Sequence, residues 1–199
     1  MQTNIIPHQK NKGFAISQLK GSIGQAIISA FLCEFGYEIY PFGYENHYVN
    51  ITRFVKRDYS DAISTKIRSM PDLLVRDKDS GELFLLQIKA KNREDGSSYL
   101  INKDRFDSYK TYWPEALLIL YYFSTGHIYC CKINEIEAEE ITLPNGTEPC
   151  YSLKLNGFSD LPRYFKLITP DRYKEFRKEI SETLRKITQL SEQYLLINT

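Results

Sequence analysis

Two pairs of short apolar runs, each joined by a turn sequence, limit most strongly how this chain can fold. Residues 72–76 and 83–89 flank the stretch DKDSGE, and residues 116–123 and 128–133 flank STGH. Asp, Ser and Gly between apolar runs of this length predict β-hairpins. A segment of helical character, 102–113, separates the two hairpins and ends before Pro114.

A helix and a strand precede the first hairpin. From Ser22, apolar residues recur at helical spacing up to Gly36, a typical helix stop, and residues 37–42 follow as a strand. Residues 1–16 are expected to be an irregular lead-in, and residues 43–69 are ambiguous. The order helix, strand, hairpin, helix, hairpin predicts an α/β fold in which helices flank a mixed β-sheet.

The last third of the chain predicts short strands around Ile141 and at 151–155, followed by a long helix over 171–196. Apolar residues recur every three or four positions along this helix, a pattern typical either of core packing or of a homodimer seam. The stripe consists of Tyr173, Phe176, Ile180, Leu184, Ile187, Leu190 and Tyr194.

Length and hydropathy favour one domain, 1–199, with a core at about 20–133 and a C-terminal elaboration at about 134–199. The longest apolar run, 116–123, is far shorter than the roughly 20 residues of a membrane helix. Residues 1–12 are polar and do not resemble a secretion signal. We therefore expect a soluble, cytoplasmic protein with no membrane partner.

The charge balance excludes a strongly basic nucleic-acid coat, because 26 Lys and Arg face 25 Asp and Glu. Residues 133–157 hold five acids and one base, so the remaining chain carries 25 bases against 20 acids. A moderately basic surface is compatible with this distribution. The four cysteines form no CxxC pair, which argues against a structural zinc site and for a reducing compartment.

The residues that carry chemistry lie at the two ends of the first hairpin: Pro71-Asp72 begins it and Gln87-Ile88-Lys89 ends it. The ends of an antiparallel hairpin meet, and Gln87 and Lys89, two residues apart, share one face of a strand. A carboxylate and an amide oxygen are hard ligands that suit Mg²⁺, and a lysine can orient or deprotonate a water and offset transition-state charge. The plainer alternative makes Asp72 a turn residue and Lys89 a side chain extending to water.

These motifs resemble the PD-(D/E)XK phosphodiesterase superfamily, in its QxK branch, which looks like type IV-like restriction endonucleases and cyanobacterial homing endonucleases. The resemblance covers about residues 20–133. KGSIGQ at 20–25 is similar to a family helix that opens G-x-x-G-E, and GYEI at 36–39 is similar to the family's G-[FY]-x-V. The resemblance implies a restriction endonuclease-like core with an added long C-terminal helix.

The resemblance also implies roles for single residues. Asp72 matches the central metal ligand, Gln87 the second acidic position and Lys89 the catalytic lysine, and Ile88, between the last two, is a further candidate for the metal site. Gln25 occupies the place of the family's first-helix acid. The implied cofactor is Mg²⁺ or Mn²⁺.

Amides at two of the family's acidic positions leave Asp72 as the one certain carboxylate, and fewer negative ligands weaken Mg²⁺ binding. Glu45, just after the first strand, is one candidate for the missing charge, and Glu38 and Glu34 are the others. The alternative to a substitute acid is that the site is catalytically degenerate.

Basic side chains near the first hairpin and the second helix are candidates for contacts with DNA phosphates, which need no sequence readout. The candidates are Lys66, Arg68, Lys91, Arg93, Lys103, Arg105 and Lys110. The alternative for each is a solvated helix face. The interleaved Tyr99, Tyr109, Tyr112 and Trp113 are expected to pack rather than to stack on bases.

Three functions remain open at this point. The first is a Mg²⁺-dependent DNA endonuclease of restriction, recombination or mobile-element type. The second is a catalytically degenerate nuclease-fold module that binds nucleic acid or a protein partner. The third is a Holliday-junction-type resolvase, which needs a symmetric dimer to place two sites on two strands, and the C-terminal helix is the candidate for its seam.

Overall fold

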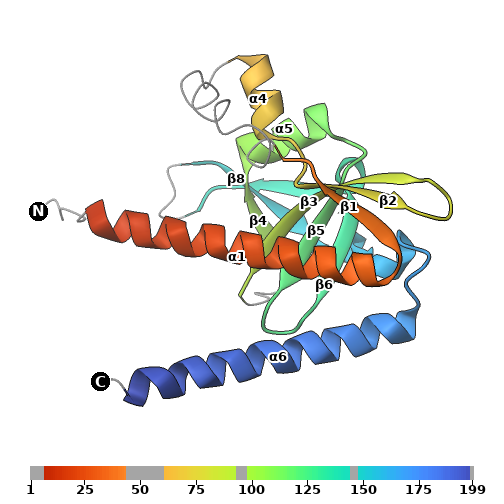
Figure 1. Cartoon of the computed structure of the whole chain (residues 1–199). Coiled ribbons are helices and arrows are strands. Elements are labelled where there is room, and N and C mark those ends of the chain that lie inside the picture. The colour runs from red at the N-terminus through yellow and green to blue at the C-terminus, as the bar shows by residue number, and fades with distance from the viewer. Residues whose placement is uncertain (1–6, 44–60, 93–97, 144–147, 198–199) are drawn as a thin grey trace, which may run out of the picture.

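The computed structural model describes residues 7–43, 61–92, 98–143 and 148–197. Six strands form the larger sheet, in the order β1-β2-β3-β5-β6-β9 (Figure 1). These strands are β1 Tyr37–Pro41, β2 Leu73–Asp77, β3 Leu83–Lys91, β5 Leu117–Tyr122, β6 Ile128–Lys132 and β9 Ser159–Asp160. Strand β3 pairs parallel with β5, and the other neighbours pair antiparallel. The predicted mixed sheet is therefore confirmed.

Two long helices, α1 (Pro7–Glu34) and α6 (Pro170–Ile197), run along one face of this sheet (Figure 1). The ring of Phe31 in α1 lies 3.9 Å from that of Phe176 and 6.2 Å from that of Tyr173, both in α6 (centroid distances). The first half of the predicted stripe on α6, from Tyr173 to Leu184, packs against the core of the same chain, as the core-packing alternative requires.

A smaller antiparallel sheet and two helices belong to the other side of the larger sheet. Its order is β4-β8-β7, with β4 Ser98–Asn102, β8 Cys150–Lys154 and β7 Ala138–Ile141. Helices α4 (Ala62–Arg68) and α5 (Lys103–Tyr112) and the 3₁₀ turns η1 (Ile133–Glu135), η2 (Leu155–Gly157) and η3 (Leu161–Arg163) complete the described elements. Phe106 and Tyr109 of α5 pack with the small sheet in a second core cluster.

The described part of the chain corrects some sequence expectations. The irregular lead-in was wrong from residue 7 onward, because α1 begins at Pro7, a residue whose fixed φ suits the first helical turn. Strand β4 forms at Ser98–Asn102, where no strand was expected from the sequence. Of the ambiguous stretch, residues 62–68 form α4, which Asp61 caps by accepting a hydrogen bond from the Ser64 N–H at 2.7 Å.

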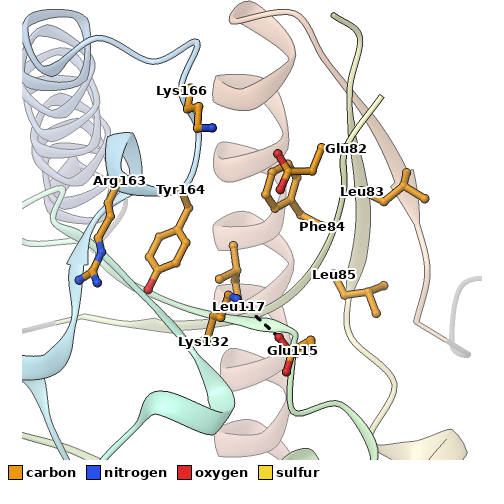
Figure 2. Close-up of a pocket in the computed structure, with 10 residues that line it drawn as sticks. All are labelled: Glu82, Leu83, Phe84, Leu85, Glu115, Leu117, Lys132, Arg163, Tyr164 and Lys166. Atoms are coloured by element: carbon orange, nitrogen blue, oxygen red, sulfur yellow. Dashed lines mark ion pairs between the residues drawn. The ribbon is translucent and has the colours of Figure 1, made fainter. Parts of the chain in front are cut away.

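Both neighbours of β3 stop near its middle, at Leu86. Strand β2 pairs with Leu83–Leu86, whereas β5 pairs with Leu86–Lys91. Among the described strands, β2 therefore leaves the second half of β3 open on its side, and β5 leaves the first half open on the other side. Beside Leu83–Leu85, before β5 begins, lies a cavity of about 370 Å³, which we call the notch (Figure 2).

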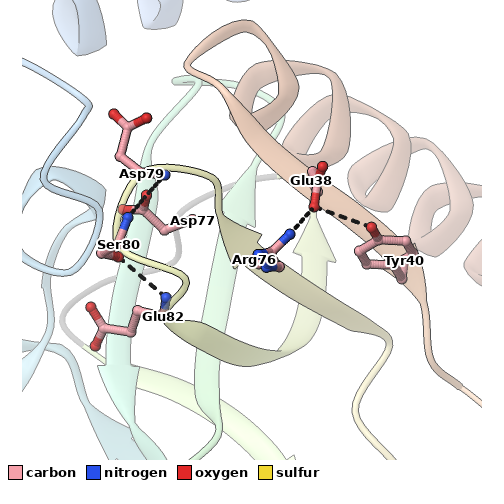
Figure 3. Close-up of polar contacts among 7 residues, drawn as sticks. All are labelled: Glu38, Tyr40, Arg76, Asp77, Asp79, Ser80 and Glu82. Carbon is pink, nitrogen blue, oxygen red and sulfur yellow. Dashed lines mark hydrogen bonds and ion pairs between the residues drawn. The ribbon is translucent and has the colours of Figure 1, made fainter.

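The turn between β2 and β3 is held by its own side chains (Figure 3). Oδ1 of Asp77 accepts hydrogen bonds from the N–H groups of Asp79 at 2.8 Å and Ser80 at 3.1 Å. These backbone hydrogen bonds, with that of Ser80 foremost, lower the pKa of Asp77. Gly81 takes a positive φ of 74°, which glycine adopts without strain. This turn fixes the register that brings the start of β2 beside the middle of β3.

Within the described residues, no helix combines the length and the apolar character that crossing a membrane requires.

Candidate active site

Asp72 lies just before β2 and is held there by three backbone hydrogen bonds. Its N–H donates to the Leu86 carbonyl at 2.8 Å, and its own carbonyl accepts from Phe42 at 2.9 Å and Gly43 at 3.2 Å. The preceding Pro71 is buried. The residue is thus tied both to β3 and to the segment that follows β1, so its position is determined by the sheet and not by a loose loop.

The Asp72 carboxylate takes the place that a further residue of β2 would have occupied beside β3. Its Oδ2 accepts the backbone N–H of Ile88 at 2.6 Å and the side-chain Nε2 of Gln87 at 2.5 Å. Gln87 is only 3% exposed, so its amide needs a partner within the protein. The hairpin therefore brings together the two side chains that the sequence placed at its ends.

Lys89 follows two residues later on β3 and shares the face of Gln87. Its Nζ lies 5.6 Å from the centre of the Tyr109 ring, a cation–π distance. The hydroxyl of the buried Tyr109 accepts a hydrogen bond from Nε of Arg105 at 2.9 Å. One buried tyrosine therefore contacts two of the predicted cations. Tyr109 was predicted only to pack, although Arg105 and Tyr109 are four residues apart on a predicted helix and are therefore neighbours on its surface.

Three more of the predicted cations lie in two different surroundings. Lys91 lies 4.3 Å from the Tyr99 ring centre, and Lys66 of α4 lies 5.8 Å from that of Trp113. Lys103, in contrast, is paired with Glu140, whose hydrogen bond raises the pKa of Lys103. Lys91 on β3 and Lys66 on α4 lie on elements next to the Asp72 site, whereas Lys103 connects α5 to strand β7 of the small sheet.

Two further cations have protein partners, and one predicted cation is not described. Arg68 donates from Nε to the Ser64 carbonyl at 3.4 Å, and Lys110 donates to the Ile136 carbonyl at 3.3 Å. Arg93 and Glu45 lie outside the described residues. The expectation that the interleaved aromatic rings pack is confirmed for Tyr99 and Tyr109, which are 7% and 1% exposed.

Gln25 lies on α1 at the point where this helix crosses β3. A Cβ atom on the neighbouring Gly24 would stand 2.7 Å from Cβ of Ala90 and 4.0 Å from Cγ2 of Ile88. The helix therefore approaches the same residue, Ile88, whose N–H the Asp72 carboxylate accepts. This places Gln25 next in sequence to the close approach of α1 to β3 at Ala90.

The other two candidate acids are engaged elsewhere. Glu34 forms an ion pair with Arg172 at 2.6 Å, and Glu38 one with Arg76 at 3.1 Å, four residues along β2 from Asp72. The Arg76 hydrogen bond lowers the pKa of Glu38. Among the described residues, no group of three or more His, Cys, Asp or Glu side chains is placed to hold a metal ion.

The donor set around Asp72 fits Mg²⁺ as a partial shell. With Nε2 of Gln87 used as a donor to Asp72, a metal would be bound through Oε1, a hard amide oxygen. Mg²⁺ in proteins is commonly held by one or two carboxylates and keeps several waters or substrate oxygens. Asp72 and Gln87 meet that minimum with a single negative charge.

Comparisons with known proteins leave the family open. No family model matches the chain, and no curated protein matches it. Among solved structures, it is similar to the structure of D212, a nuclease from a fusselovirus, at 15% identity and a TM-score of 0.34, over 90% of this chain and 99% of that one. A score of this size does not establish a shared fold.

Proposed function

We propose that this protein is a Mg²⁺-dependent DNA endonuclease that hydrolyses phosphodiester bonds, of restriction, recombination or mobile-element type. The observation that supports this proposal is the Asp72 carboxylate held by Gln87 and Ile88 at an open edge of β3, with Lys89 on the same face. A structural aspartate needs no lysine two residues beyond its partner. A phosphodiesterase does need such a lysine, because negative charge develops on the phosphoryl oxygens during the reaction.

Each side chain then has one task. Asp72 and Oε1 of Gln87 would hold the metal, which supplies charge neutralisation and an acidified water when bound. Lys89 offsets charge at the reacting phosphate, and the buried Tyr109 beneath it limits where its ammonium can lie. Lys66, Lys91 and Arg105 contact neighbouring phosphates without reading sequence.

The test is cleavage of supercoiled plasmid and of branched DNA with Mg²⁺ or Mn²⁺, each compared with EDTA. Asp72→Asn is the sharpest variant, because one amide oxygen at the position of Oδ2 can still accept from both Ile88 and Gln87 while the charge is lost. Lys89→Met keeps the aliphatic stem and removes the ammonium. We expect both variants to fold and to lose roughly a hundredfold or more in cleavage rate.

The matched control is Lys154→Gln on β8, an exposed lysine of the small sheet, which should cleave like the wild type. Wild-type rates in Asp72→Asn would refute the assignment of the metal ligand. A Lys89→Met protein that fails to fold would make that lysine structural.

A second candidate function is a non-catalytic module that binds nucleic acid. The observation that favours it is that the described part of the site offers one carboxylate, already engaged by two donors. Metal-independent DNA binding that survives Asp72→Asn, with no cleavage of any substrate by the wild type, would select this candidate. Preference for the branched substrate by a dimer in solution would instead select a junction resolvase.

A further inference from the structure

The notch lies on the other open half of β3, away from the Asp72 site. Figure 2 shows Arg163, Tyr164 and Lys166 on one side of it and the first residues of β3 on the other. Its floor is formed where β5 begins, at Leu117. A volume of about 370 Å³ lies in the range of pockets that hold small molecules.

Backbone polar groups of β3 point toward this cavity. The carbonyl of Leu86 accepts from Asp72 on the β2 side, and that of Lys91 accepts from Phe123 on the β5 side. Successive residues of a strand direct their N–H and C=O to opposite neighbours, so Leu83 and Leu85 direct theirs to the β5 side. Strand β5 begins only opposite Leu86. In this parallel ladder the N–H of Leu117, the partner of Leu86, is directed at the carbonyl of Leu85, so the groups of β3 that border the notch are the N–H of Leu85 and the N–H and carbonyl of Leu83.

The side chains around the notch add positive charge. Lys132, Arg163 and Lys166 contribute three cations, against the two carboxylates of Glu82 and Glu115. Glu115 is balanced by Lys132, whose Nζ lies 3.5 Å from its Oε2. Arg163 and Lys166 remain against the exposed Glu82, and Lys166 also interacts electrostatically with Asp77. Both cations come from the segment that includes η3.

Aromatic rings complete the lining. Phe84 and Tyr164 both border the notch, and each is only partly buried. The Arg163 guanidinium lies 5.7 Å from the Tyr164 ring centre and donates to Oγ of Ser159 at 2.7 Å, so its position is determined by two contacts. Ring faces beside fixed cations suit a ligand with both an aromatic part and an anionic part.

We propose that the notch binds a nucleoside monophosphate. Arg163 and Lys166 bind the phosphate, Phe84 and Tyr164 contact the base, and the open edge at Leu83 and Leu85 hydrogen-bonds the base edge, which carries both donors and acceptors. A simple anion would use the cations but leave the rings and the strand edge without a role. The proposal does not depend on the Asp72 site being an active nuclease.

The experiment is calorimetric titration of the full chain with dAMP and dCMP, with deoxyadenosine and inorganic phosphate as the separated parts of the ligand. We expect saturable binding of a nucleotide with a Kd on the order of 0.1–1 mM and weaker binding of either part. Arg163→Gln combined with Lys166→Gln should weaken nucleotide binding roughly tenfold, the loss of two charge-assisted contacts. Both residues are exposed, so this double variant should fold.

Two controls make the result specific to the notch. Lys154→Gln, an exposed charge change on the small sheet, and Asp72→Asn, at the other open edge of β3, should leave the nucleotide Kd unchanged. Phe84→Leu should weaken dAMP but not inorganic phosphate. Absence of saturable nucleotide binding at about 10 mM, equal binding of phosphate alone, or full binding by the double variant would each overturn the proposal.

Discussion

Within the described residues, strand β3 has two open edges, and different side chains border each of them. Beyond Leu86 on the β2 side, a side chain replaces the missing strand, because the Asp72 carboxylate accepts the Ile88 N–H. Before Leu86 on the β5 side, the residues of β3 have no paired residue in β5, and cations from the η3 segment border a cavity. The Asp72 edge presents one carboxylate with Lys89 on the same strand, whereas the notch is lined by three cations and two carboxylates.

The difference teaches how one strand can serve two kinds of ligand. An unpaired edge in the middle of a sheet exposes backbone groups that need partners. Where the chain supplies an acid, the edge suits a cation, and where it supplies bases, the edge suits an anion. We expect the stability of the protein to depend more on the side chains at the Asp72 edge than on those at the notch.

The largest effect is expected from Asp72→Ala. It leaves the Ile88 N–H and the buried amide of Gln87 without their acceptor, which should lower the free energy of unfolding by roughly 2–4 kcal/mol. Asp72→Asn keeps an acceptor and should change it by less than about 1 kcal/mol. Arg163→Gln, at the exposed notch, should change it by less than about 0.5 kcal/mol. Urea unfolding of the three variants measures this order, and equal losses would contradict it.

The next prediction concerns the helix that backs the Asp72 edge. Gly24→Ala would place a methyl group 2.7 Å from Cβ of Ala90. We expect a net loss of roughly 1–2 kcal/mol, because the clash exceeds the gain of about 1 kcal/mol in helix propensity. Thermal unfolding should show this loss as a lower Tm, and the further substitution Ala90→Gly should restore part of it.

Gly21 supplies the control on the same helix. A Cβ there would meet nothing within 4 Å, so Gly21→Ala should stabilise the protein by up to about 1 kcal/mol. If both glycine variants shift the Tm in the same direction, the close packing of α1 on β3 at Ala90 does not determine the effect of Gly24→Ala on stability.

Gln87→Glu sharpens the comparison by adding charge at the Asp72 edge. Two carboxylates within hydrogen-bond distance raise the pKa of one of them above its unfolded value. Such a group contributes stability that is present below the unfolded pKa and lost as pH rises through the folded one. We therefore expect a variant less stable than wild type by roughly 1–2 kcal/mol at neutral pH, with the deficit shrinking toward about pH 5.

Mg²⁺ should relieve the same repulsion. The Tm of Gln87→Glu should rise with millimolar Mg²⁺ more than that of wild type, since an ion that binds only the folded state stabilises it. Asn156→Asp, an exposed amide-to-acid change in η2, is the matched control and should show neither response. A Gln87→Glu protein indifferent to both pH and Mg²⁺ would argue against a metal site here.

Local chemistry explains what could be predicted from the sequence. The turn sequence from Asp77 to Glu82 fixes the first hairpin, and the hairpin alone brings Asp72 to Gln87. Strand β4 could not be predicted, because SYLIN buries only Tyr99 and Ile101 deeply and pairs with a strand that lies about 50 residues further along the chain.

The two open edges also lie beyond sequence periodicity. Alternation of apolar and polar residues shows which face of β3 is buried, but not where β5 begins relative to β3. That register depends on the crossover through α5 and on packing in both core clusters. The long α1 was underestimated for a related reason, since its first turns lack the apolar stripe that marks a helix from sequence.

The smallest effect is expected from Gln25→Glu, which tests whether α1 belongs to the Asp72 edge. Gln25 is next to Gly24, where an added Cβ would lie 4.0 Å from Cγ2 of Ile88. The Asp72 carboxylate accepts the N–H of Ile88. A carboxylate added there should attract a cation held by Asp72, so the Mg²⁺ concentration that gives half-maximal cleavage should fall roughly two- to fivefold. The measurement is a Mg²⁺ titration of plasmid cleavage for wild type and Gln25→Glu, with Gln18→Glu, an exposed position on the same helix, as the control. If the midpoint rises instead, or if the control shifts equally, the added charge acts through the general field of the protein, and the metal ligands lie on β3 and before β2 without help from α1.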